Sequence, residues 1–416
     1  MQKLRNIILL KLCLSRAVFR GRADKFLVEI ASSTRNDRSR ALGAGLNVLI
    51  IQMAKMGDMV CTTPVFRAIK NKYPNARVIV MGNAMNKELL AGNPDISEYI
   101  TYDKNNFWGI LRQIRGLRLD VGILTGPSPE FLAMLYLSGA PLVVAPYIEN
   151  GFCPHETRVY KTLCRLVATR PHRMGSYAPR EYLRLLEPMG IFTEDTRKHL
   201  SILNNRQGKI ATQSLAMTEG GDGGRKEIVV GIAPGTGHKI KLWPSERFAK
   251  LADEIVKKYN AKIAVIGGAG DKKEVDEMIN VMENRDCFGG NRPPTGDLPK
   301  GDNDGMGGCE RADNLSVDDL KILISKLDLF ISVDTGPIYI AEAYGVPTVC
   351  IVGPMDEREQ PPRGERHKIV VAKREKSELH IMNNAVFNYN EARRQVEDIS
   401  AEMVMGKVDE VLKNHL

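Results

Sequence analysis

The chain has 416 residues, of which 43% are hydrophobic and 26% are charged, so it is long and apolar enough for two domains with separate cores. Its seven cysteines include no CxxC pair and its seven histidines no HExxH motif, which argues against a disulfide framework and against a metal site. The formal net charge is +9, but residues 1–46 carry ten Lys or Arg against three acidic residues, which leaves only +2 for the rest. We therefore predict a reduced, cytoplasmic protein that does not bind nucleic acid.

Residues 1–46 form a basic extension with one apolar stripe at helical spacing, made of Ile7, Leu10, Leu14 and Val18. This pattern is typical of an amphipathic helix on an anionic membrane surface. The apolar run from Ile7 to Leu10 is too short to span a bilayer and Lys11 interrupts it, so neither a membrane span nor a signal peptide is predicted. Two other interpretations stay open: a disordered basic arm, or a mis-called start before a protein that begins near Leu46.

The first strand–turn–helix unit starts with the apolar run Val48 to Gln52 and continues through Gly57 and Asp58 into a helical pattern. Glycine permits a tight turn with a close backbone approach, and Asp58 then lies at the carboxyl end of a parallel strand, where open α/β sheets bind ligands. Asp58 is therefore a candidate site residue. The alternative is that it caps a helix beginning near Val60.

A polar, glycine-rich stretch at 204–225 separates two halves that each alternate strand and helix patterns, and we interpret it as an interdomain linker. The second half opens with a strand pattern at 228–232, followed by Gly235, Thr236 and Lys241 ahead of a helix. A glycine-rich turn with a hydroxyl group and lysines at this place can hold a phosphate. It is neither a GxxxxGK[ST] loop nor a GxGxxG fingerprint, so nucleotide hydrolysis and nicotinamide binding are weakly supported.

Residues 284–314 are rich in glycine, proline and acidic residues and cannot bury a core, which predicts a mobile surface loop inserted in the second half. Both a lid over a binding site and disorder without a function stay open.

A third strand–turn–helix unit contains Asp334, Thr335 and Gly336, between an apolar run at 327–332 and a helical pattern at 338–344. The start of a helix offers backbone N–H groups and the positive end of a dipole to an anion, so this turn is a candidate site for a nucleotide diphosphate. The alternative is an ordinary turn in which Asp334 or Thr335 caps the helix.

In their order and spacing, these motifs resemble those of the bacterial heptosyltransferases of lipopolysaccharide core synthesis, glycosyltransferase family nine. The resemblance covers nearly everything from about Asn47 to the C-terminus. It rests on Gly57-Asp58 with Thr62, Thr63 and Pro64; on Pro234-Gly235-Thr236, Lys241, Trp243-Pro244 and Glu246-Arg247-Phe248; on Gly267-Gly268 before Asp271; and on Asp334-Thr335-Gly336-Pro337 with Gly345-Val346-Pro347-Thr348 and Gly353-Pro354.

The resemblance implies an α/β chain with the GT-B fold, in which two Rossmann-like domains face one another across a cleft. It places an acceptor domain at 47–203, a nucleotide-sugar donor domain at 226–372 and a C-terminal helical segment at 373–416.

By the same resemblance, Asp58 matches the family's catalytic aspartate, the base that removes the proton of the acceptor hydroxyl, and Lys241 matches a lysine of the family that we assign to the donor diphosphate. The predicted donor and nucleotide site further contains Gly57, Gly235, Thr236, Gly267, Asp334, Thr335, Gly336, Tyr339 and Glu342. Trp243 is interpreted as a packing anchor. The chain departs from many family members at Tyr339, where they carry a histidine.

The function implied is inverting, metal-independent transfer of a heptose or related sugar, from ADP-heptose or another nucleotide sugar, to a saccharide or lipid-linked acceptor, with no cofactor. Two alternatives stay open: another nucleotide-sugar transferase or epimerase on the same fold, or a non-catalytic nucleotide-sugar-binding protein.

Overall fold

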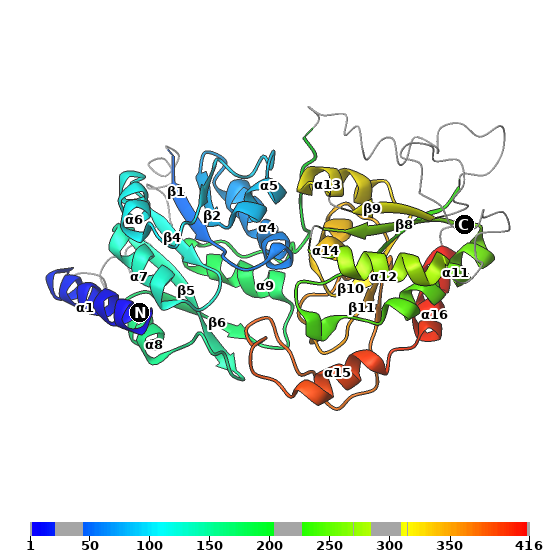
Figure 1. Cartoon of the computed structure of the whole chain (residues 1–416). Helices are drawn as coiled ribbons and strands as arrows, with labels where there is room; N and C mark the ends of the chain where they lie inside the picture. The colour runs from blue at the N-terminus through cyan, green and yellow to red at the C-terminus, as the bar shows by residue number, and fades with distance from the viewer. Residues whose placement is uncertain are drawn as a thin grey trace. The chain divides into compact units, whose positions relative to one another are not determined.

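The computed structural model describes residues 2–20, 45–203, 227–268, 270–283, 309–313 and 315–413 (Figure 1). The predicted linker at 204–225, most of the predicted insert at 284–314 and much of the N-terminal extension lie outside the described residues. The chain forms two compact units. Unit 1 comprises residues 1–201, 358–360 and 380–386, and unit 2 comprises residues 202–357, 361–379 and 387–416.

Unit 1 is built on a six-stranded parallel sheet in the order β3-β2-β1-β4-β5-β6. Its central strands are nearly continuous apolar runs, as expected for parallel strands covered on both faces. In β1, residues 48–51 are fully buried, and Val48 lies in register with Val78 of β2 and Val121 of β4. The strands are β1 (Asn47–Ile51), β2 (Arg77–Gly82), β3 (Glu98–Thr101), β4 (Val121–Leu124), β5 (Leu142–Asn150) and β6 (Ala168–Arg173).

Helices cover both faces of this sheet. The helices are α1 (Gln2–Arg20), α4 (Met56–Lys72), α5 (Ala84–Leu89), α6 (Phe107–Gly116), α7 (Pro129–Ser138), α8 (Arg158–Cys164) and α9 (Ala178–Leu183), with a 3-10 turn η1 (Arg184–Met189). Side chains of α1, α6, α7 and α8 share one core cluster with β1 and β2, whereas α4 packs against α9. Helix α1 lies beside α7 and α8 (Figure 1). None of the described helices is long and apolar enough to cross a membrane.

Unit 2 repeats this architecture with a parallel sheet in the order β12-β11-β10-β7-β8-β9. Its strands are β7 (Val229–Ala233), β8 (Lys262–Gly267), β9 (Cys309–Asp313), β10 (Leu329–Val333), β11 (Thr348–Ile351) and β12 (His367–Val370). Its helices are α11 (Ser245–Tyr259), α12 (Lys272–Glu283), α13 (Val317–Ser325), α14 (Gly336–Ala343), α15 (Tyr389–Glu397) and α16 (Ala401–Lys413), with a 3-10 turn η3 (Lys239–Lys241). Side chains of α11, α12 and α16 pack with β7, β8 and β10 in one core.

Strand β9 departs from the prediction that residues 284–314 form a loop. Residues 309–313 pair with β8 at the edge of the sheet, with Ala312 buried and Arg311 exposed. In an edge strand only every second side chain needs to be buried, and its outer face tolerates charge. Residues 309–313 are therefore too polar to be predicted as a strand from their hydrophobicity.

In both units the strand order reverses direction at one point. The reversal lies between β1 and β4 in unit 1 and between β10 and β7 in unit 2. Doubly wound sheets bind ligands outside the carboxyl ends of the strands at such a reversal. The three predicted motifs follow β1, β7 and β10, so the fold puts each of them at this place of its own unit.

The buried histidine of β6 predicts acid sensitivity of unit 1. Burial, and to a smaller extent the positive charge of Arg184, lower the pKa of His172 from 6.5 to about 4. The unfolded chain therefore takes up the proton first, and stability present above pH 6.5 is lost as the pH falls toward 4, by about 3 kcal/mol in total. Urea unfolding across this range should show a smaller loss for His172→Asn than for the wild type. Equal slopes for the two proteins would contradict the prediction.

Candidate functional site

In unit 1, Asp58 lies in the first turn of α4, after the buried Gly57. The helix begins at Met56, because the N–H of Met59 already bonds the carbonyl of Lys55 at 3.2 Å. Lys55 therefore occupies the N-cap position, and the interpretation of Asp58 as the cap of a helix starting near Val60 is wrong. A carboxylate in the first turn still benefits from the helix dipole.

The side chain of Asp58 is held by a residue 302 positions further along the chain. Nε2 of Gln360 donates a hydrogen bond to Oδ1 of Asp58 at 2.9 Å, and Gln360 is only 6% exposed. The backbone carbonyl of Asp58 accepts a hydrogen bond from the hydroxyl of Thr62 at 2.8 Å. Sequence reasoning missed Gln360, since it belongs to none of the motifs and its partner is distant in the chain.

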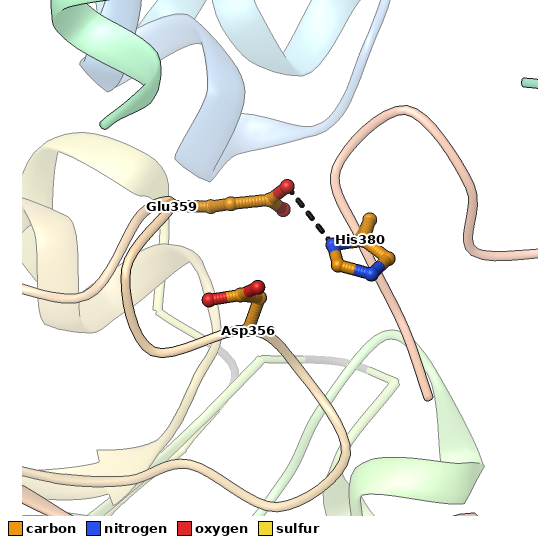
Figure 2. Close-up of side chains that lie close together, drawn as sticks. All are labelled: Asp356, Glu359 and His380. Carbon is orange, nitrogen blue, oxygen red and sulfur yellow. Dashed lines mark hydrogen bonds and ion pairs between the residues drawn. The ribbon is translucent and has the colours of Figure 1, made fainter. Parts of the chain in front are cut away.

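The neighbouring Glu359 attaches this short segment to unit 1. Its carboxylate is buried and accepts the backbone N–H groups of Gly175 and Ile381, each at 2.7 Å. Nδ1 of His380 lies 3.0 Å from Oε1 of the same carboxylate. Figure 2 shows the two side chains pointing toward one another. Since both carboxylate oxygens accept backbone hydrogen bonds, we assign Glu359 a structural role that presents the next residue, Gln360, to Asp58.

In unit 2, the predicted residues meet at the adjacent carboxyl ends of β7 and β10. Nζ of Lys241, from η3, lies 2.7 Å from Oδ2 of Asp334 and donates to the backbone carbonyl of Asp334 at 3.0 Å. Asp334 is 2% exposed, so its carboxylate needs this counter-ion.

Tyr339 supplies the second partner of the buried carboxylate. Its hydroxyl donates a hydrogen bond to Oδ1 of Asp334 from the following helix, α14, and its side chain is 2% exposed. Asp334 therefore receives Tyr339 on one oxygen and Lys241 on the other. The sequence predicted these three residues as donor contacts, whereas the structure also makes them partners of one another.

The remaining predicted residues surround this group or support it. Thr335 occupies the N-cap position of α14 without a side-chain cap bond, and Gly336 is the first residue of the helix. Oγ1 of Thr236 accepts the N–H of His238 at 3.4 Å, and Oε1 of Glu342 accepts the N–H of Arg363 at 3.4 Å.

Two glycines allow close packing around the turns of unit 2. A Cβ at Gly235 would lie 2.3 Å from the carboxylate of Asp271, and one at Gly267 would lie 2.6 Å from Cγ2 of Val275 on α12. No side chain fits at such distances.

Trp243 is a packing anchor, as interpreted from the sequence. Its ring is 2% exposed and packs edge to face on Phe248, with the two ring centroids 4.7 Å apart. Nε1 donates a hydrogen bond to the carbonyl of Ile399 at 2.8 Å.

Known proteins resemble this chain in sequence and in fold. Residues 308–387, which include Asp334 and Tyr339, match the family model of glycosyltransferase family 9 (heptosyltransferase). A lipopolysaccharide heptosyltransferase 3 from Escherichia coli (strain K12) is 24% identical over 310 residues, covering 72% of this chain and 80% of that protein. The predicted relationship to glycosyltransferase family 9 is confirmed. The prediction that the chain is a glycosyltransferase is confirmed with it.

Solved structures share the fold of this chain. The structure of a family 9 glycosyl transferase from Veillonella parvula DSM 2008 gives a TM-score of 0.66 at 19% identity, covering 89% of this chain and 98% of that one. That of the E. coli ADP-heptose LPS heptosyltransferase II gives 0.65 at 16% identity, covering 89% and 100%. With two doubly wound parallel sheets in this chain, these matches confirm the α/β class and the GT-B fold.

The role of Tyr339 beside Asp334 can be measured as a contribution to the free energy of unfolding. Tyr339→Phe removes a donor from a buried carboxylate and should lower the free energy of unfolding by about 1–3 kcal/mol. The matched control is Tyr344→Phe at the end of the same helix, because the hydroxyl of Tyr344 is buried without a hydrogen-bond partner among the described residues. That variant should be at least as stable as the wild type. Equal losses in urea unfolding of the two variants would contradict the role of Tyr339.

Proposed function

We propose that the chain is an inverting, metal-independent glycosyltransferase that moves a heptose or related sugar from ADP-heptose to a saccharide or glycolipid acceptor. The acceptor class is the lipopolysaccharide core or another cell-surface glycan. The observation that carries this proposal is the match to heptosyltransferases, in a chain that has Asp58, Lys241 and Asp334 after the strands at which the sheet order reverses.

In the proposed reaction, the acceptor hydroxyl attacks the anomeric carbon of the donor while the bond from that carbon to the diphosphate oxygen breaks. Asp58 accepts the hydroxyl proton, and ADP leaves with the electron pair of the broken bond. A single displacement of this kind inverts the anomeric centre. The hydrogen bond from Gln360 supports this role, because it fixes the orientation of the carboxylate that would accept the proton.

Stabilisation of the departing diphosphate is assigned to unit 2. Lysine carries three N–H donors on a flexible stem, and Asp334 holds the ammonium of Lys241 at the carboxyl ends of β7 and β10. The turn after β7, with Gly235 and Thr236, and the start of α14 add backbone N–H groups that suit phosphate oxygens. These groups would offset the charge of the diphosphate without a metal or other cofactor.

The proposed enzyme is cytoplasmic and works at the inner-membrane face, where a lipid-linked acceptor is available. Residues 1–46, with their excess of basic residues, are the proposed membrane contact. The rest of the chain has a net charge close to zero, which argues against a nucleic-acid partner.

A pair of substitutions should separate the role of Asp58 as the base from the role of Lys241 in binding the diphosphate. Asp58→Asn should lower turnover by roughly two or more orders of magnitude, the usual contribution of a general base, and leave ADP affinity nearly unchanged. Lys241→Ala should instead weaken ADP binding in calorimetry by about 1.5–3 kcal/mol, whereas Lys239→Ala, which removes an exposed lysine of the same turn, should not. Near-normal turnover of Asp58→Asn, or unchanged ADP affinity of Lys241→Ala, would remove that residue from the site.

The reaction itself can be tested by mass spectrometry of products. The protein is incubated with a panel of nucleotide sugars and membrane glycolipid extracts, with and without excess EDTA. We expect one heptose or related sugar to be added from the ADP-activated donor, at a rate that EDTA does not change. Loss of activity in EDTA that magnesium restores would overturn the metal-independent mechanism, and transfer from a different donor alone would overturn the ADP-heptose assignment.

A further inference from the structure

Helix α1 is fixed to unit 1 by one of its faces. Leu9 and Cys13 are fully buried in the core cluster that α1 shares with α6, α7 and α8. Nη1 of Arg16 donates to the carbonyl of Leu137, at the end of α7, at 2.6 Å. These contacts make α1 a part of unit 1.

The opposite face of α1 is also largely apolar. At 3.6 residues per turn, its exposed residues 7, 8, 11, 12, 14 and 15 form one continuous arc of about 160°. Four of these six are large hydrophobic residues with 40–47% of their surface exposed: Ile7, Ile8, Leu12 and Leu14. Lys11 lies near the middle of the arc. Single exposed apolar residues are common, but a helix face with four of them marks an interaction surface.

The charge of the N-terminal segment in the sequence indicates the partner. Residues 1–46 carry seven of the nine net positive charges of the chain. A helix with an apolar face and an excess of Lys and Arg binds in the plane of an anionic membrane, and a central lysine can extend its ammonium group to the lipid headgroups while its stem stays among apolar side chains.

We propose that the outer face of α1, formed by Ile7, Ile8, Leu12 and Leu14 around Lys11, binds the surface of an anionic lipid bilayer. This deepens the membrane contact proposed above and does not depend on the transferase chemistry. Because Leu9 and Cys13 pack in the core, the helix holds unit 1 at the membrane as one body. Removal of residues 1–46 would also remove this packing, so substitutions on the exposed face are the cleaner test.

The experiment is co-sedimentation of the full chain with vesicles of phosphatidylcholine, with or without phosphatidylglycerol. The wild type should bind the vesicles that contain phosphatidylglycerol and be released as salt rises. The double variant Ile8→Ser, Leu12→Ser should bind at least about tenfold more weakly, since two apolar side chains no longer enter the interface. Phe192→Ser is the matched control, because it removes an apolar side chain of unit 1 that is 79% exposed and lies outside α1.

Equal binding by the wild type and the double variant would overturn the proposal, as would binding that does not require phosphatidylglycerol. A wild-type dimer in analytical ultracentrifugation that the double variant converts to a monomer, without vesicle binding, would show that the face joins two copies of the chain. Transfer to a water-soluble acceptor is measured on the same proteins. Unchanged transfer with lost vesicle binding supports the proposal, whereas absent transfer with intact vesicle binding would contradict the enzyme function alone.

Discussion

The constraint on which both units depend is the geometry of a parallel sheet. Parallel strands must be joined by crossover connections, so the carboxyl ends of all strands lie along one edge of the sheet. Where the strand order reverses, the connections leave in opposite directions and the edge between them stays accessible. Residues after β1, and residues after β7 and β10, therefore lie where a ligand can be bound, although β7 and β10 are about a hundred residues apart in the chain.

At this edge of unit 2, a buried carboxylate organises the candidate donor site. An ionised aspartate without partners would be costly in the interior, and Asp334 meets this cost with an ammonium on one oxygen and a phenol on the other. A histidine at position 339, which the resemblance led us to expect, could carry a charge, whereas the tyrosine hydroxyl is a neutral donor. In this chain the positive charge beside Asp334 therefore comes from Lys241, which the same contacts hold at the proposed diphosphate site.

In unit 1 the carboxylate of Asp58 is also held by a side chain, but this side chain comes from the C-terminal part of the chain. Gln360 contacts the carboxylate, and Glu359 is held by two backbone N–H groups from different segments. The surroundings of the proposed base therefore require residues that follow most of the second sheet in sequence. A first half of the chain expressed alone would lack them.

What the sequence by itself determined is the local part of this structure. The apolar runs that became β1, β7 and β10 and the glycine-containing turns after them were readable, because burial of a parallel strand and the start of a helix depend on residues close in the chain. The sequence did not predict that α4 starts at Met56. One backbone hydrogen bond begins the helix earlier in the chain than the cap expected at Asp58. Only the tertiary structure decided that Tyr339 and Lys241 share Asp334, that Gln360 reaches Asp58, and that α1 buries Leu9 while it exposes Leu12. These contacts join elements up to 302 residues apart, and side-chain pairing at that separation leaves no periodic pattern in a single sequence.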